Sequence, residues 1–244
     1  MSLKAKYILA ILFGGVVLTA IIIRICINQT TFVDDSYIFL RLAENAVNGH
    51  GFRWNINEAP LEGYTSFLYF LINIFAVRFF LHPELFLQIF GIMTSFATIV
   101  FIYLLYNEVD PKLKTENLIT TILVSISPCF VYWSVAGMET SFYMMFLMFS
   151  LFIYFKKSNA PLIYIVTGAL FAILYLIRPE CIVFFIYVLF FTSYQLFRER
   201  NKSKWLLLIC MVFGFQFIFA SYFMWHLKYF GVLFPNSYYA KVGG

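Results

Sequence analysis

Charged residues are scarce in this chain. Asp, Glu, Lys and Arg together make up 12% of its 244 residues, about half the share found in soluble domains. No polar segment is long enough to form a separate soluble domain. Hydrophobic residues make up 62%, and they fall in runs of roughly 16–22 residues, the length at which a helix crosses a bilayer. The composition therefore predicts a single membrane domain over residues 1–244, built from transmembrane helices.

Cysteine is also scarce, and its placement excludes familiar cysteine chemistry. The four cysteines, Cys26, Cys129, Cys181 and Cys210, stand in or beside apolar runs at no metal-binding or redox spacing, as buried structural thiols do. The net charge of +5 is modest. Its basic residues sit in short clusters between apolar runs, a pattern that indicates membrane topology rather than nucleic-acid binding.

The apolar runs give the candidate spans. They are 7–27, 65–81, 85–106, 118–133, 141–155, 161–177, 181–197 and 205–225. Lys4 and Lys6 precede the first run and no small-x-small cleavage site follows it, so we expect a retained signal anchor with a cytoplasmic N-terminus.

The positive-inside rule decides which runs cross the membrane. It assigns the basic links to the cytoplasm, and these links carry Lys112, Lys114, Lys156, Lys157, Arg198, Arg200, Lys202 and Lys204. If 65–81 crossed as well, every one of them would lie outside. We therefore expect seven spans, with 65–81 as an aromatic helix in the outer interface. The links that face outward then include a first external loop over 28–84.

Acidic residues gather on the predicted outer side. Asp34 and Asp35 open the first external loop, just before an amphipathic segment over 36–47 that we expect to lie on the membrane. Glu62 follows in the same loop, and Glu139 stands where a later span reaches the outer surface. The inner links carry the basic clusters, and such asymmetry is typical of an enzyme that works at the membrane–water boundary.

Each of these residues also has a plainer structural explanation. The aspartates could cap a helix, Glu62 could be a solvated or capping loop acid, and Glu139 could favour a helix dipole. Arg178 and Glu180 could form an ion pair across Pro179. For the cations of the last outer segment, His226, Lys228 and Lys241, the corresponding explanation is snorkelling toward lipid headgroups.

The motifs, taken in order, resemble those of the GT-C class of glycosyltransferases, multispan enzymes that use polyprenyl-phosphate sugars as donors. The segments that carry the resemblance are DDSYIFLRLAENAVNGHGFRWN (34–55), LEGYTSFLY (61–69), GMET (137–140), RPE (178–180) and FPNSYYAK (234–241). Within the class they are most similar to the terminal arabinofuranosyltransferase-like branch. The second acidic motif and the helix after it also resemble those of aminoarabinose and protein O-mannosyl transferases. Such enzymes usually carry further spans, so the resemblance implies the N-terminal part of a longer enzyme.

The resemblance implies an inverting transfer of a hexose or pentose to a glycan, lipid or protein acceptor on the external face of a bacterial inner (plasma) membrane. Asp34 or Asp35 would be the base, with Asp34 preferred. Glu62 and Glu139 would orient the acceptor or hold Mg²⁺ or Mn²⁺, and Arg178 would hold the donor phosphate. The other residues to which it gives a part are Lys241 and His226 as further phosphate ligands, and Glu180, Asn236, Tyr238 and Tyr239 as motif residues.

Two other classes of protein are compatible with parts of this pattern. A transporter would place ionisable groups near the bilayer midplane and often shows an inverted repeat, whereas the predicted spans here are nearly free of charge and show no internal repeat. A non-catalytic assembly subunit would differ from an enzyme in its tolerance of changes at Asp34 and Asp35.

Overall fold

The computed structural model describes residue 15 and residues 32–156, 160–199 and 205–233, and the regular elements in these residues are helices. Their bounds are α2 Asp34–Val47, α3 Phe67–Phe79, α4 Pro83–Val109, α5 Lys114–Ser125, α6 Pro128–Val135, α7 Thr140–Phe155, α8 Pro161–Ile177, a 3₁₀ turn Pro179–Cys181, α9 Ile182–Glu199 and α10 Trp205–Phe230. The prediction of an all-helical membrane domain is confirmed at this level.

Proline sets several of the helix boundaries. Pro83, Pro128 and Pro161 stand in the first turns of α4, α6 and α8, where a missing N–H is no loss. Pro128 also disfavours helix at the residue before it, and Ser127 is accordingly extended, with φ −62° and ψ 124°. The apolar run over 118–133 is therefore divided into α5 and α6, which meet at a bend of 54°.

The seven-span count predicted from the sequence is not supported. Within the described residues, three helical segments are long and apolar enough to cross a membrane: Pro83–Val109, Pro179–Arg198 and Trp205–Phe230. A fourth is added if the bent pair α5–α6 counts as one span. The reason is length, because α7 and α8 have 16 and 17 residues, or about 25 Å at 1.5 Å per residue, against a hydrocarbon core of about 30 Å. Apart from residue 15, the predicted span over 7–27 lies outside the described residues.

Helix α3 is shorter than the run that predicted it. It has 13 residues, or about 20 Å, which is too short to cross the hydrocarbon core unaided. This length agrees with the expectation of a helix that does not span. Its position in the membrane interface stays a prediction.

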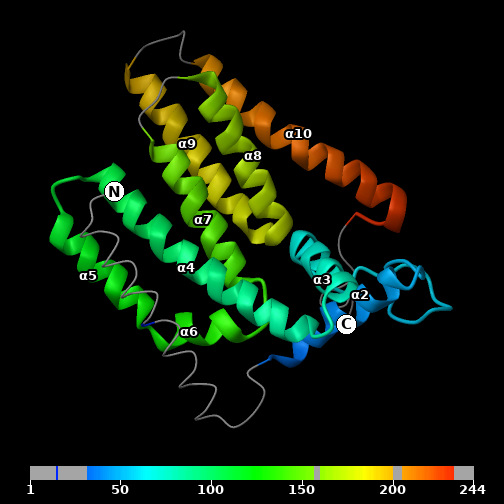
Figure 1. Ribbon diagram of the computed structural model, residues 1–244. Helices are drawn as coiled ribbons and strands as arrows, with labels where there is room; N and C mark the ends of the chain where they lie inside the picture. The colour runs from blue at the N-terminus through cyan, green and yellow to red at the C-terminus, as the bar shows by residue number, and fades with distance from the viewer. Residues whose placement is uncertain (1–14, 16–31, 157–159, 200–204, 234–244) are drawn as a thin grey trace, which may run out of the picture.

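Helices α8 and α10 pack side by side and run in the same direction (Figure 1). Glycine allows their backbones to approach closely, because a Cβ atom built on Gly168 would collide with the carbonyl oxygen of Met211, and one on Gly214 with that of Ile165. Small residues play this part at many helix–helix contacts in membranes. The pair Gly168–Gly214 therefore fixes the distance between α8 and α10.

We expect Gly168→Ala and Gly214→Ala each to destabilise the protein by about 1–3 kcal/mol, the usual penalty for overpacking a close contact. Thermal unfolding in lipid nanodiscs would measure the loss. Val166→Leu is a suitable control, because Val166 is on the same helix but is 39% exposed. Alanine variants that unfold at the wild-type temperature would contradict the close contact.

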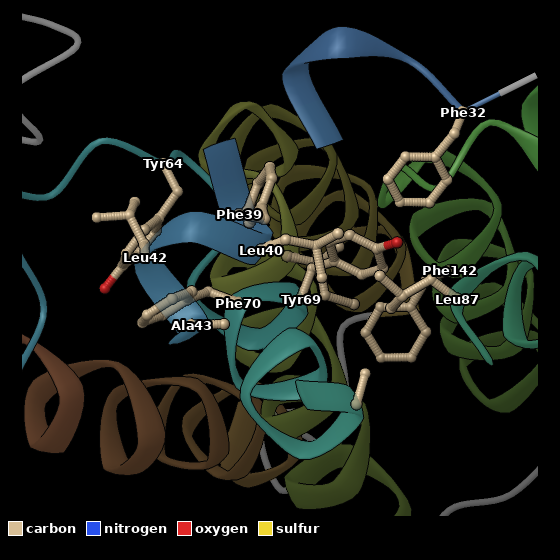
Figure 2. Packing of buried hydrophobic residues seen from close by; sticks show 12 residues of the cluster. Phe32, Phe39, Leu40, Leu42, Ala43, Tyr64, Tyr69, Phe70, Leu87 and Phe142 are labelled. Carbon is tan, nitrogen blue, oxygen red and sulfur yellow. The ribbon is translucent and has the colours of Figure 1, made fainter. Parts of the chain in front are cut away.

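Helices α2 and α3 pack across one end of the bundle (Figure 1). Figure 2 shows the cluster beneath them, which joins apolar residues of α2 and α3 to Leu87 of α4 and Phe142 of α7. Leu42 and Ala43 of α2 are fully buried in this cluster. The helix predicted over 36–47 is therefore present, but the expectation that its apolar face lies on the membrane is wrong, since the protein itself covers that face.

Charged residues lie at both ends of the bundle, but among the described residues the buried ones lie at one end. Helices α7 and α9 begin and α8 and α10 end near α2 and α3, together with Glu139 and His226 (Figure 1). The links at the opposite end carry exposed or half-buried charges of both signs, among them Lys112, Lys156 and Arg198 and the acids Glu108, Asp110 and Glu116. The α2–α3 end is therefore distinguished by its buried charged or titratable side chains, Glu62, Glu139 and His226.

Candidate functional site

Asp34 and Asp35 form the exposed first turn of α2. The capping position belongs to Val33, and no side chain caps the helix. The explanation of the aspartates as N-caps is therefore wrong, although negative charge in a first turn is favoured by the helix dipole. Within the described part of the chain, neither carboxylate has a hydrogen bond or an ion pair that occupies it.

The start of α2 is attached to the turn between α6 and α7. The backbone N–H of Val33 and the hydroxyl of Ser36 both donate to the carbonyl oxygen of Ala136, at 3.0 and 3.1 Å. The Tyr69 hydroxyl of α3 donates to the next carbonyl, that of Gly137, at 2.7 Å. Gly137 has a φ of +73°, a conformation that glycine adopts without strain. These bonds hold the aspartates and the turn that carries Glu139 in one fixed arrangement.

Glu139 is buried and paired with Arg178. Its Oε1 atom accepts hydrogen bonds from Nε and Nη2 of Arg178 at 3.0 and 2.7 Å. The predicted alternative of an ion pair between Arg178 and Glu180 is wrong, because the arginine turns to Glu139 across 39 residues of sequence and Glu180 is exposed. The pair joins the end of α8 to the start of α7.

The Glu139–Arg178 pair leaves hydrogen-bonding capacity unused. The Glu139 Oε2 atom is buried and has no partner among the described residues, and the Arg178 side chain is 38% exposed. The donors on its Nη1 atom have no partner in that part of the chain either. A guanidinium fixed on one edge and open on another is well suited to bind an anion such as phosphate.

Glu62 forms a second buried group with α10. Its Oε2 atom lies 2.7 Å from Nε2 of His226, and its Oε1 atom accepts a hydrogen bond from the Tyr222 hydroxyl at 3.3 Å. Glu62 is 2% exposed, so the explanation of a solvated loop acid is wrong. Burial raises the pKa of Glu62, while the hydrogen bond and the charge of His226 act in the opposite direction.

The His226 side chain does not extend toward the lipid headgroups, as the snorkelling explanation would require. It is 4% exposed and is turned to Glu62 rather than to the surface, so it holds the loop before α3 against α10. The loop is attached there a second time, since the Phe52 N–H donates to the Tyr229 hydroxyl at 3.1 Å.

Sequence reasoning missed Tyr222, Tyr69 and Ser36. Tyr222 could have been found, because it lies four residues before His226 in an apolar helix and the two side chains therefore share a face. Tyr69 and Ser36 gave no comparable signal, since their partners are backbone carbonyls about 70 and 100 residues away.

The predicted residues fall into two groups on either side of the α2 core. Figure 2 shows Phe32, which begins the segment of Asp34 and Asp35, and Tyr64, which follows Glu62, on opposite sides of the cluster. Hydrogen bonds connect the start of α2, which carries Asp34 and Asp35, to the turn before Glu139, and Glu139 to Arg178, whereas Glu62 is bonded to His226. The prediction that one site unites the four acids stays a prediction. Lys241, Asn236, Tyr238 and Tyr239 lie outside the described residues.

Few side chains that could bind a metal ion lie close together in the described segments. No group of three or more His, Cys, Asp or Glu side chains gathers there. Glu62 and Glu139 each face a nitrogen base or cation of the protein instead. The expectation of Mg²⁺ or Mn²⁺ stays a prediction.

These helices define an all-helical integral membrane protein. Comparisons of the chain with protein-family models, with curated proteins and with solved structures give no match. Its function must therefore be argued from the chemistry of the site.

Proposed function

We propose that this protein is a membrane glycosyltransferase that moves a sugar from a polyprenyl-phosphate donor to a glycan, lipid or protein acceptor. One observation carries the proposal. The turn between α6 and α7 connects the start of α2, where the Asp34 and Asp35 carboxylates have no described partner, to Arg178, whose guanidinium is exposed on one edge. A transfer of this kind needs one base and one anion-binding group, and the sequence motifs at these positions resemble those of the GT-C class.

The proposed reaction is a single inverting displacement. A hydroxyl of the acceptor gives its proton to Asp34, with Asp35 as the second choice, while its oxygen attacks the anomeric carbon of the donor sugar. The bond from that carbon to the lipid phosphate breaks, and the phosphate keeps the electron pair. Arg178 stabilises the phosphate charge as it develops.

The buried acids have supporting parts in this proposal. Glu139 fixes the orientation of Arg178 through the two hydrogen bonds that its Oε1 atom accepts. The Glu62–His226 pair holds the first external loop on α10, so that α2 keeps its position relative to α8.

The direct test is transfer by the purified full-length gene product in liposomes. Polyprenyl-phosphate-linked pentoses and hexoses would be supplied with cell-envelope glycan extracts, with and without EDTA, and the glycosylated product measured. Incorporation of label from a donor supports the proposal. An absence of transfer from every donor, with folded protein, would favour a non-catalytic assembly subunit.

We expect Arg178→Lys to weaken donor binding about tenfold. A lysine keeps the charge, but its single nitrogen cannot bond to Glu139 and also offer the donor phosphate all the N–H groups that the guanidinium offers. The loss of one charge-assisted hydrogen bond to the phosphate is worth roughly 1.5 kcal/mol. The apparent donor affinity would be measured in the same assay. Glu180→Gln is the matched control, since Glu180 is an exposed neighbour outside the pair. Equal donor affinity in Arg178→Lys and wild type would remove Arg178 from the donor site.

The proposal places the α2–α3 end of the bundle on the external face of a bacterial inner (plasma) membrane. We expect Glu58→Cys, in the exposed part of the first loop, to react with an impermeant thiol reagent added to intact cells. Lys112→Cys at the other end should react only after the cells are opened. Both variants would be made in a background without the four natural cysteines. External labelling of Lys112→Cys would reverse the orientation.

A further inference from the structure

The outward face of α2 continues from Asp34 as a strip of exposed side chains. Tyr37 and Arg41 follow at spacings of three and four residues, and all three are exposed. At 100° per residue they lie within an arc of about 60° on one face of the helix. The opposite face of α2 is buried in the core cluster.

Tyr37 is exposed but its ring is held in place. The ring packs edge-on against Phe32, with the two centroids 5.0 Å apart, and Phe32 is itself buried against Gly137. Tyr37 nevertheless remains 45% exposed. A fixed aromatic ring that is open on one side loses little conformational entropy when it binds a ligand.

A second fixed ring comes from the loop after α2. Trp54 lies over the guanidinium of Arg41, with 5.6 Å from the Arg41 Cζ atom to the ring centroid. Its backbone is held by Asn45, whose Nδ2 atom donates to the carbonyl oxygens of Arg53 and Trp54 at 2.7 and 3.0 Å. Trp54 is 37% exposed, and the Arg41 N–H groups have no hydrogen-bond partner among the described residues.

We infer that Tyr37, Arg41 and Trp54 form the binding site for a carbohydrate acceptor, which lies along α2 with its reacting end at Asp34. This inference rests on the proposed function, whose acceptor class it narrows from glycan, lipid or protein to glycan. Sugar rings present C–H groups on their faces, which pack on aromatic rings, and hydroxyls on their edges, which accept hydrogen bonds from a guanidinium.

The dimensions of the strip suit an oligosaccharide. Asp34 and Arg41 are seven residues apart, or about 10 Å along the helix axis. A chain of several sugar units therefore contacts the aromatic residues while its terminal hydroxyl reaches the proposed base. Contacts between the glycan and the aromatic residues, away from the reacting atoms, would orient the terminal hydroxyl for attack.

The mixed chemistry of the strip favours a glycan over lipid. Charged groups alternate with the two aromatic rings along it, whereas the surfaces of α9 and α10 expose apolar residues such as Phe190, Phe197 and Phe217. An acyl chain would leave Arg41 and Asp34 without water or partners, which is costly for charged groups. A glycan offers hydroxyls to both.

The test measures glycan binding without donor, so it does not depend on transfer. The full-length protein in nanodiscs would be mixed with linear tetrasaccharides of pentoses and of hexoses, and binding followed by saturation-transfer difference NMR. We expect binding by wild type, a loss of about tenfold in Tyr37→Ala and in Trp54→Ala, and retention in Trp54→Phe. Tyr194→Ala is the matched control, because Tyr194 is an exposed aromatic residue of α9.

The outcomes separate this inference from the proposed function. Wild-type binding in both Tyr37→Ala and Trp54→Ala, or no binding of any tetrasaccharide by a protein that does transfer sugar, would overturn the inference alone. Binding that depends on both rings, in a protein that transfers nothing, would support a glycan site and overturn the proposed enzyme. Quenching by brominated acyl chains that disappears in Trp54→Phe would place Trp54 in lipid and overturn the glycan site.

Discussion

Asp34→Asn is expected to lose roughly 10²–10⁴-fold in the rate of sugar transfer, the usual contribution of a general base. The substitution keeps the shape of the side chain and removes its charge. It should leave folding almost unchanged, because Asp34 is exposed and its carboxylate has no partner in the described structure. Product formation from a polyprenyl-phosphate sugar at matched protein levels is the measurement.

The neighbouring aspartate and a distant acid complete this experiment. Asp35→Asn tests whether the second carboxylate shares the role, and Glu58→Gln is the matched control, an exposed acid of the same loop. If both aspartate variants transfer sugar at nearly the wild-type rate, the pair is not the base. Glu62 and Glu139 would then be the remaining candidates.

His226→Leu is expected to destabilise the protein by about 3 kcal/mol, the upper end of the penalty when a buried carboxyl group loses a hydrogen-bond partner. The loss arises because Glu62 stays buried with only the Tyr222 hydroxyl as a partner. Thermal unfolding in nanodiscs would report it. His82→Leu is the matched control, since His82 is exposed at the start of α4.

A double variant distinguishes a buried pair from a general packing defect. In Glu62→Leu/His226→Leu neither polar partner remains, so most of the lost stability should return, as it does when both members of a buried pair are replaced by apolar residues. An unfolding temperature for His226→Leu close to that of His82→Leu would show that the Glu62–His226 contact contributes little.

The helical class could be predicted because it depends on local patterns. Apolar runs of about 20 residues predict membrane helices. The number of spans could not be predicted equally well. Pro128 divides one run into two helices, and α7 and α8 prove shorter than the hydrocarbon core is thick.

The residues of the candidate site could be named from sequence, but their partners could not. Arg178 pairs with Glu139, 39 positions away, although Glu180 is nearer in the chain. Glu62 and His226 are separated by 164 positions. Such pairs are set by how helices pack against one another, and a single sequence shows the charged side chains without the packing that joins them.

The unequal lengths of neighbouring helices connect this bundle to the thickness of its bilayer. Helix α10 has 26 residues, or about 39 Å, some 9 Å more than the hydrocarbon core, whereas its neighbour α8 has 17 residues and falls short of it. A long helix meets this mismatch by tilting or by extending beyond the membrane surface, and a short one by thinning the lipid around it. The height of His226 relative to the lipid phosphates, and with it the height of the first loop, therefore depends on the acyl-chain length of the host membrane.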